Sequence, residues 1–196
     1  MKTSIIRRRD GLHELHLSGS SANPYWIAAL FSGLSELGVS VVSASGAHDP
    51  RNGWNARMAL GFGGSRWQPE QVDYAALVNR QVYTAGLPLP RLSGFLLARR
   101  ADHGLEARLA APDQAGFLCR LLPRISSLAL YPVELETGTA GGRIRDRLVF
   151  RGIGGLAPGD TAFASLQSLL GRMTTRTVAP AAAKPAGTLR SDAATP

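Results

Sequence analysis

The 196-residue chain, 44% of it hydrophobic, can bury the core of one ordinary domain or of two small ones, which argues against disorder of the whole chain. It lacks the run of about 20 apolar residues that crosses a bilayer, and its single cysteine excludes an internal disulfide, so we expect a cytoplasmic protein without membrane contact. The net charge of +8 gathers at the two ends of the chain and is accompanied by no nucleic-acid-binding motif, which argues against a nucleic-acid partner.

The first half of the chain predicts a βαββαβ unit over residues 11–102, preceded by a basic N-terminal arm over residues 1–10. The alternating segment LHELHL predicts a half-buried strand, and Asn23 is a suitable N-cap for the helix that follows it. Proline and acidic residues begin a second helix, as the first turn of a helix favours. The predicted elements are a strand at 12–17, a helix at 24–37, strands at 39–45 and 54–62, a helix at 69–82 and a closing strand at 91–100.

The second half, residues 103–178, repeats this order at an offset of 92 residues. Glu14 then lies over Glu106, and Leu17 over Leu109. The predicted elements are a strand at 105–111, a helix at 114–127, strands at 130–137 and 143–150, a helix at 159–173 and a short last strand at 174–178. Residues 179–196, rich in alanine and proline, are expected to form a disordered tail. The predicted fold class is α+β, with two tandem ferredoxin-like units whose antiparallel sheets carry helices on one face.

The turn at residues 111–122, APDQAGFLCRLL, is the first candidate ligand site. Asp113 is expected to cap the following helix, and Gly116 leaves the first helical N–H groups open to a ligand carboxylate. The alternative is a purely structural turn, in which the aspartate caps and the glycine allows close packing. The candidate binding residues are Asp113, Gln114, Ala115 and Gly116, and their counterparts in the first half are Ser20, Ser21 and Asn23.

The segment GRIRDRLVF predicts a second candidate surface. Alternation along a strand places Arg143, Arg145 and Arg147 on one side, where they could bind a carboxylate, a phosphate or an acidic partner. The alternative is a solvated charged face. Asp146 falls on the opposite, apolar side, where it needs a partner if it is buried; we expect an arginine or a loop N–H group.

The order of elements and the motifs of the second half resemble a tandem pair of ACT domains, the small-ligand-binding regulatory modules of amino-acid metabolism. The resemblance rests on PDQAGFL between strand and helix and on LETGTAGGRIRDRLVF in the following strand pair. It implies a regulatory protein, a homodimer without a cofactor, that binds an amino-acid-like carboxylate or a partner protein. The matching positions are Asp113, Gly116, Thr137, Gly142 and Asp146. The first half departs from the pattern, because Ser21 and Pro24 stand in place of the aspartate and the glycine.

An enzyme is the alternative interpretation, with cyclisation, isomerisation or lyase chemistry on a polyketide-like intermediate of bacterial natural-product biosynthesis. Its acid–base candidates are Glu14, His16, His48 and Asp146. No metal site is expected, since the two histidines of the first predicted strand lie on opposite faces. The aromatic residues concentrated in the first half, among them Trp26 and Trp54, line an apolar pocket or belong to the core.

Overall fold

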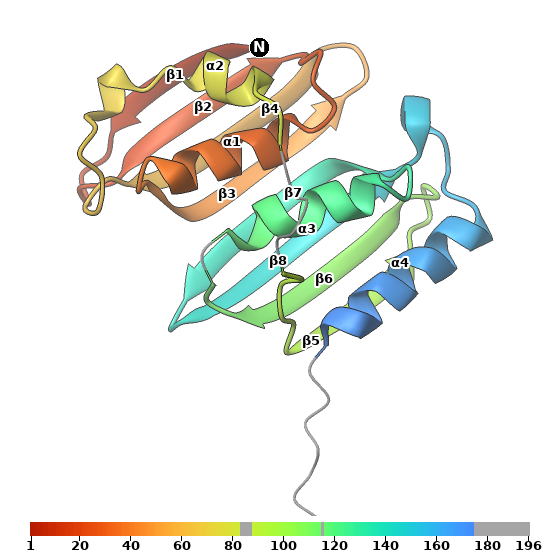
Figure 1. Ribbon diagram of the computed structural model, residues 1–196. Coiled ribbons are helices and arrows are strands. Elements are labelled where there is room, and N and C mark those ends of the chain that lie inside the picture. Colours follow the sequence, from red (N-terminus) through yellow and green to blue (C-terminus); the bar gives the residue numbers. More distant parts are fainter. Residues whose placement is uncertain (83–87, 115, 175–196) are drawn as a thin grey trace, which may run out of the picture.

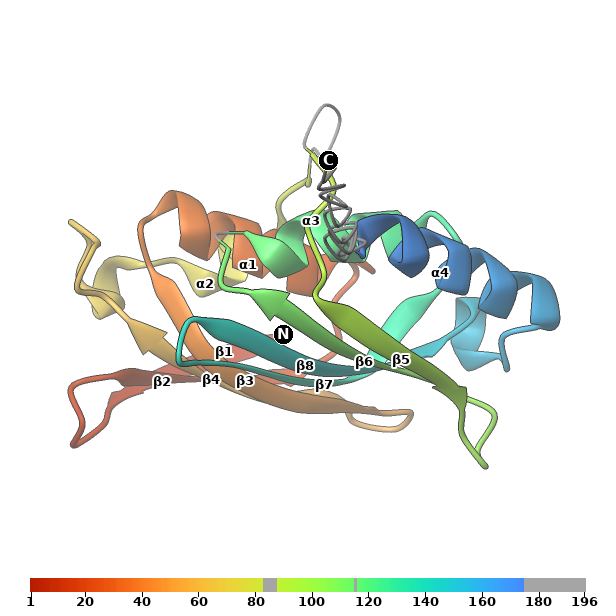
Figure 2. The ribbon, with the colours of Figure 1, turned by 90° about the horizontal axis from the view of Figure 1, so that it is seen from below.

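The computed structural model describes residues 1–82, 88–114 and 116–174 and has a mixed α+β architecture. Eight strands form one antiparallel sheet in the order β1-β2-β4-β3-β7-β8-β6-β5. The helices of the described residues lie together on one face of this sheet (Figures 1 and 2). The strands are β1 (Lys2–Arg7), β2 (His13–Gly19), β3 (Ser40–Asp49), β4 (Gly53–Gly61), β5 (Gly94–Arg99), β6 (Leu105–Pro112), β7 (Tyr131–Ala140) and β8 (Arg143–Arg151). The α-helices are α1 (Trp26–Glu36), α2 (Tyr74–Asn79), α3 (Phe117–Ser126) and α4 (Asp160–Met173).

The order of elements repeats, but the repeating unit differs from the predicted one. Each half runs ββαββα rather than βαββαβ. Residues 2–7, predicted as part of a basic arm, form β1 and pair with β2. The strand predicted to close the first unit is β5, which pairs with β6 of the second half. The strand order is symmetric about the central β3–β7 pair, where the two halves join.

Local hairpins explain this difference. A short turn between Arg8 and Leu12, with the Arg8 N–H donating to the Leu12 carbonyl, folds β1 directly back on β2. A similar turn between Arg100 and Gly104 folds β5 back on β6. Strands that are neighbours in sequence usually pair, and a hairpin needs no crossover connection. The predicted last strand reaches the described residues only at Thr174, which forms an isolated bridge with Leu92, and the predicted disordered tail lies outside them.

The helices are shorter at their N-termini than predicted. The helix expected from residue 24 begins at Trp26, and Asn23 accepts a hydrogen bond from the Tyr25 N–H instead of capping it. The helix expected from Gln114 begins at Phe117. The segment predicted as a helix over 69–82 contains a short 3₁₀ turn and the six-residue α2, which is capped by the side chain of Asp73. Among the described residues no helix is both long and apolar enough to cross a membrane.

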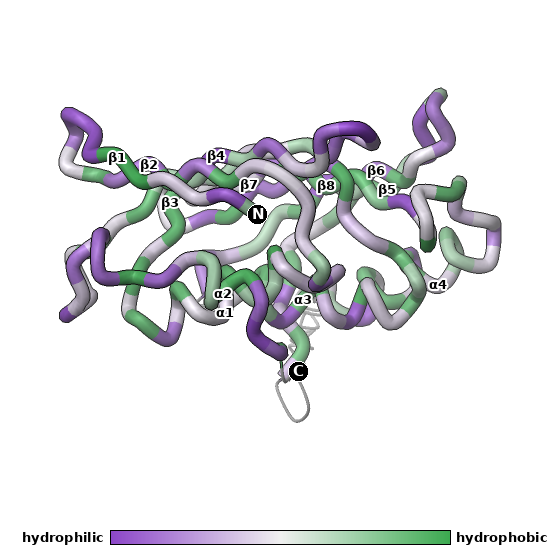
Figure 3. The backbone as a smooth tube through the Cα atoms, turned by 90° about the horizontal axis from the view of Figure 1, so that it is seen from above, coloured by the Kyte–Doolittle hydropathy of each residue, from purple (hydrophilic) through white to green (hydrophobic). Residues whose placement is uncertain are grey.

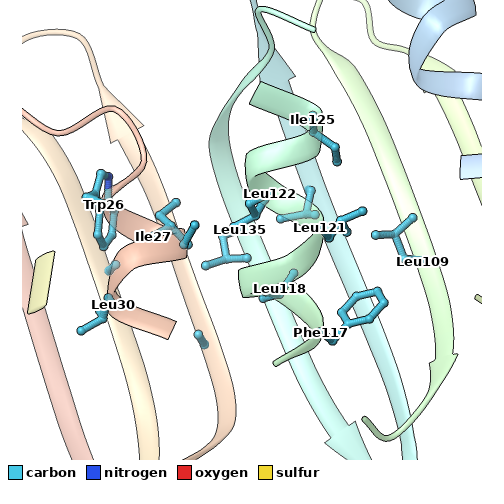
Figure 4. Close-up of a cluster of buried hydrophobic side chains, with 14 of the residues drawn as sticks. Trp26, Ile27, Leu30, Leu109, Phe117, Leu118, Leu121, Leu122, Ile125 and Leu135 are labelled. Atoms are coloured by element: carbon cyan, nitrogen blue, oxygen red, sulfur yellow. The ribbon is translucent and has the colours of Figure 1, made fainter. Parts of the chain in front are cut away.

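The core lies between the sheet and the helices and is continuous across both halves. Most of the buried apolar side chains belong to a single cluster. Figure 4 shows Ile27 of α1, Leu122 of α3 and Leu135 of β7 in the space between the two central helices, all of them at most 2% exposed. Hydrophilic and hydrophobic residues alternate along the strands, as a sheet with one covered face requires (Figure 3).

Candidate functional site

Two grooves flank the central β3–β7 pair, and each is built from both halves of the chain. The first, which we name the Asp146 groove, has a volume of about 480 Å³. The second, the Trp54 groove, has a volume of about 470 Å³. Their sizes suit small molecules. Each groove contains the strand-to-helix turn of one half, so the two turns singled out in the sequence belong to different grooves.

The Asp146 groove contains four of the five motif residues of the second half, whereas Gly142 does not line it and instead accepts a backbone hydrogen bond from Asp113. Its other wall comes from the end of α1 and the start of β3 in the first half. The described residues that line it include two aspartates and no lysine, arginine or histidine, so the groove is acidic. They are Phe31, Ser35, residues 38–42, Asp113, Gln114, Gly116, Phe117, Leu118, Thr137, Thr139, Ile144 and Asp146.

Asp146 is the most unusual side chain of this groove. It is 3% exposed and stands on the helix-side face of β8. Its Oδ1 accepts a hydrogen bond from the Thr137 hydroxyl. Its Oδ2 is buried without a partner among the described residues. Burial raises the pKa of Asp146 to about 6, against the lowering effects of the Thr137 hydroxyl and the Gly138 N–H.

The repeat shows that the fold itself does not require an acid at this position. Leu109 faces Asp146 across the β6–β8 pair, and Leu17 faces Ala56 across the β2–β4 pair. Leu17 and Leu109 occupy the same position of the 92-residue repeat. Ala56 is therefore the counterpart of Asp146, and it is buried to a similar degree, at 1% exposure.

The partner of Asp146 is replaced as well. Thr137 faces Asp146 across the β7–β8 pair, and Gly46 faces Ala56 across the β3–β4 pair. A side chain at Gly46 would place its Cβ 2.6 Å from the Cβ of Ala56. Two small residues thus stand in the first half at the positions where the second half has a hydroxyl and a carboxylate. A buried carboxylate with one free oxygen costs free energy, so its presence indicates a role other than stability.

The turn before α3 differs from its prediction. No side chain caps the helix, because Gly116 is the N-cap residue with a left-handed φ of 67°, and Asp113 is exposed. Gln114 is held by the backbone of Arg91, to which its side chain both donates and accepts hydrogen bonds. Ala115 lies outside the described residues. Asp113, Gln114 and Gly116 do line the groove together with Asp146, and no side chain caps the start of α3 there.

The Trp54 groove contains the three candidates of the first half. Ser20, Ser21 and Asn23 line it, but the amide nitrogen of Asn23 donates to the carbonyls of Val78 and Arg80 and is therefore structural. The groove also contains His48, which was predicted as an acid–base candidate, and Trp26 and Trp54, which were predicted to line an apolar pocket or to belong to the core. Its other lining residues were not predicted as site residues; they are Pro24, Tyr131, Pro132, Val133 and the turn at residues 152–155. The aromatic residues of the first half indicated a pocket in the sequence, whereas the contribution of the second half to the Trp54 groove follows only from the strand order.

The three arginines lie together on the open face, as the alternation predicts. Arg143 and Arg145 are exposed, and Arg147 is half-buried. Arg147 forms ion pairs with Glu106 at 2.9 Å and with Glu134 at 3.0 Å, so its guanidinium is already occupied. The arginines border a third, larger hollow of about 840 Å³ on this face.

The four acid–base candidates do not form one site. Glu14 Oε1 and His16 Nε2 are 2.5 Å apart on the open face of β2. His48 lines the Trp54 groove, and Asp146 lines the other groove. The described residues contain no group of three or more histidine, cysteine, aspartate or glutamate side chains that could hold a metal ion.

Comparisons with protein-family models, with curated proteins and with solved structures returned no match for this chain.

Proposed function

We propose that this protein is a regulatory, small-ligand-binding protein built from two ACT-like units, and that its ligand is amino-acid-like. The strand order supports this proposal. Moving the last strand of a βαββαβ unit to the front of the chain leaves that strand at the same edge of the sheet and gives the order β1-β2-β4-β3 of the first half. The same rearrangement describes the second half, and the groove at the junction of the two halves has a volume that suits a small ligand.

The buried Asp146 carries the proposal. Its Oδ2 needs a hydrogen-bond donor, which the ammonium group of an amino acid supplies at the floor of the groove. The ligand carboxylate then meets the N–H groups at the start of α3, near Phe117 and Leu118, which no side chain caps. A carboxylate without an ammonium group would be repelled by Asp113 and Asp146. The groove therefore suits a zwitterion better than the simple carboxylate expected from the turn alone.

A thermal-shift screen of the standard amino acids at neutral pH, followed by calorimetric titration, tests this function. A ligand at about 100 times its Kd should raise the Tm by roughly 5 °C. Asp146→Asn, which replaces the unpartnered oxygen by an amide, should reduce the affinity at least about 100-fold. Asp160→Asn is the matched control, since it removes an exposed acid that pairs with Arg99 away from the groove. Absence of a shift with every amino acid would contradict the proposal.

Enzymatic chemistry on a polyketide-like intermediate is a second candidate function, and one observation favours it. A carboxyl group with a pKa of about 6 suits general acid–base catalysis near neutral pH. In this role ionised Asp146 would remove a proton next to a carbonyl, giving an enolate, and would return the proton to carbon. The measurement is deuterium uptake from D₂O by acetoacetyl-N-acetylcysteamine, followed by NMR. Uptake that Asp146→Asn abolishes supports an enzyme, and uptake equal to that of buffer excludes this chemistry for the probe.

A further inference from the structure

The Trp54 groove differs from the Asp146 groove in its charge. None of its described lining residues is an aspartate, glutamate, lysine or arginine, and His48 is the one histidine among them. Trp26, Trp54 and Tyr131 contribute aromatic surface, and Pro132 and Val133 add apolar surface from the other half. An uncharged, largely apolar lining with few polar groups is typical of a pocket for a neutral organic molecule.

The rings of this groove are held in fixed positions. Trp26 and Trp54 meet edge to face, with ring centroids 5.2 Å apart and planes at 74°. His48 meets Trp54 at 5.9 Å and 65°. Edge-to-face contacts of this kind are favourable and define where a further ring can pack. Ser20 is exposed at the rim, and its hydroxyl and the His48 ring can orient a polar substituent.

An exposed apolar side chain stands beside this groove. Ile153 lines it and is 64% exposed. It belongs to a glycine-rich turn in which Gly154 and Gly155 have left-handed φ values of 66° and 79°. When a ligand covers a large, solvent-exposed apolar side chain, the free energy of the complex is lowered. The turn therefore provides the apolar cover that the groove lacks.

We propose that the Trp54 groove is a second ligand site, specific for an uncharged aromatic molecule of one or two rings. The two grooves share no lining residue and differ in charge, so this site is independent of the Asp146 groove. The replacement of Asp146 and Thr137 by Ala56 and Gly46 removes the buried acid from this half, so an ammonium group finds no partner there. Recognition instead rests on packing against the aromatic lining, in which Tyr131 is half-buried and Trp26 and Trp54 are 3% and 7% exposed.

The probe is 2-naphthol, whose fluorescence can be excited beyond the absorption of tryptophan. It should bind in a saturable manner with one site per chain. Ser20→Trp places a large side chain at the rim of the Trp54 groove and should weaken binding at least about tenfold. Ser40→Trp, the matched control, places the same side chain at the rim of the Asp146 groove and should leave the Kd unchanged. Ile153→Ser should weaken binding about fivefold without lowering stability, because this side chain is exposed.

The possible outcomes separate this site from the proposed amino-acid site. Absence of saturable binding, or an equal loss of binding in Ser20→Trp and Ser40→Trp, overturns the proposal. Displacement of 2-naphthol by cyclohexanol at the same concentration overturns the aromatic specificity. If Ser20→Trp does not fold, a Kd that Ile153→Ser leaves unchanged would overturn the proposal instead. The amino-acid titration reports on the other groove, so either proposal can fail while the other stands.

Discussion

The two halves of the chain share their order of elements and differ in the chemistry of their grooves. At equivalent positions of the sheet, the second half has Thr137 and Asp146, whereas the first half has Gly46 and Ala56. The strand-to-helix turn differs in the same sense, with Asp113 in one half and Ser21 in the other. The apolar strand positions therefore recur between the halves, and the polar groove positions do not, so the fold does not require the polar groups.

The largest effect that tests this comparison is expected at Asp146. Because burial raises its pKa to about 6, the folded protein binds a proton more tightly than the unfolded chain, whose aspartate has a pKa of 3.8. The free energy of unfolding should fall as the pH rises from about 4 to about 6 and level off above that. Asp146→Asn should remove this dependence and raise the free energy of unfolding at neutral pH by about 2–3 kcal/mol. Urea unfolding at several pH values measures it.

The control for this experiment is Asp160→Asn, which changes the same charge at an exposed position. It should leave the slope of stability against pH between about 4 and 6 intact. If Asp146→Asn were less stable than the native protein at neutral pH, the carboxylate would be contributing to the fold rather than to a ligand site.

An intermediate effect is expected at the counterpart position, Gly46. An added Cβ would lie 2.6 Å from the Cβ of Ala56 and 3.0 Å from its Cα, and a backbone atom cannot turn away. Gly46→Ala should therefore reduce the free energy of unfolding by about 1–3 kcal/mol. Gly138→Ala, in the paired strand of the other half, meets nothing within 4 Å and is the matched control. Thermal unfolding of both variants provides the measurement, and equal stability of the two would show that the first half can accept a larger side chain here.

Local patterns predicted most strands, because alternation such as LHELHL and RIRDRLVF records which face is covered. They did not predict β1, since Ile5 and Ile6 are its only large apolar residues and three arginines follow them. They also assigned β5 to the wrong half, because a strand pattern does not specify its partner. Asp146 was recognisable as an acid among apolar neighbours. The opposite wall of its groove, residues 38–42, is remote in sequence and follows only from the β3–β7 junction.

The smallest effect is expected on the open face, where Arg147 and Arg57 are counterparts because they face Arg108 and His16 in equivalent pairs. Arg147 neutralises Glu106 and Glu134, whereas none of the ion pairs between described residues includes Arg57. Arg147→Met should lower the free energy of unfolding by about 1 kcal/mol, and Arg57→Met by less than about 0.5 kcal/mol.

The free energy of unfolding at low pH provides a second comparison of Arg147 and Arg57. The pKa of Glu106 is lowered, first by the hydrogen bond from Arg108 and then by Arg147. A lowered carboxyl pKa stabilises the fold above the ordinary pKa of glutamate, and this stabilisation is lost as the pH falls through the folded value. Arg147→Met should make that loss smaller, and Arg57→Met should leave it unchanged. Urea unfolding of both variants at several acidic pH values measures this loss, and an equal response would show that the charges of the open face act through net charge rather than through specific pairs.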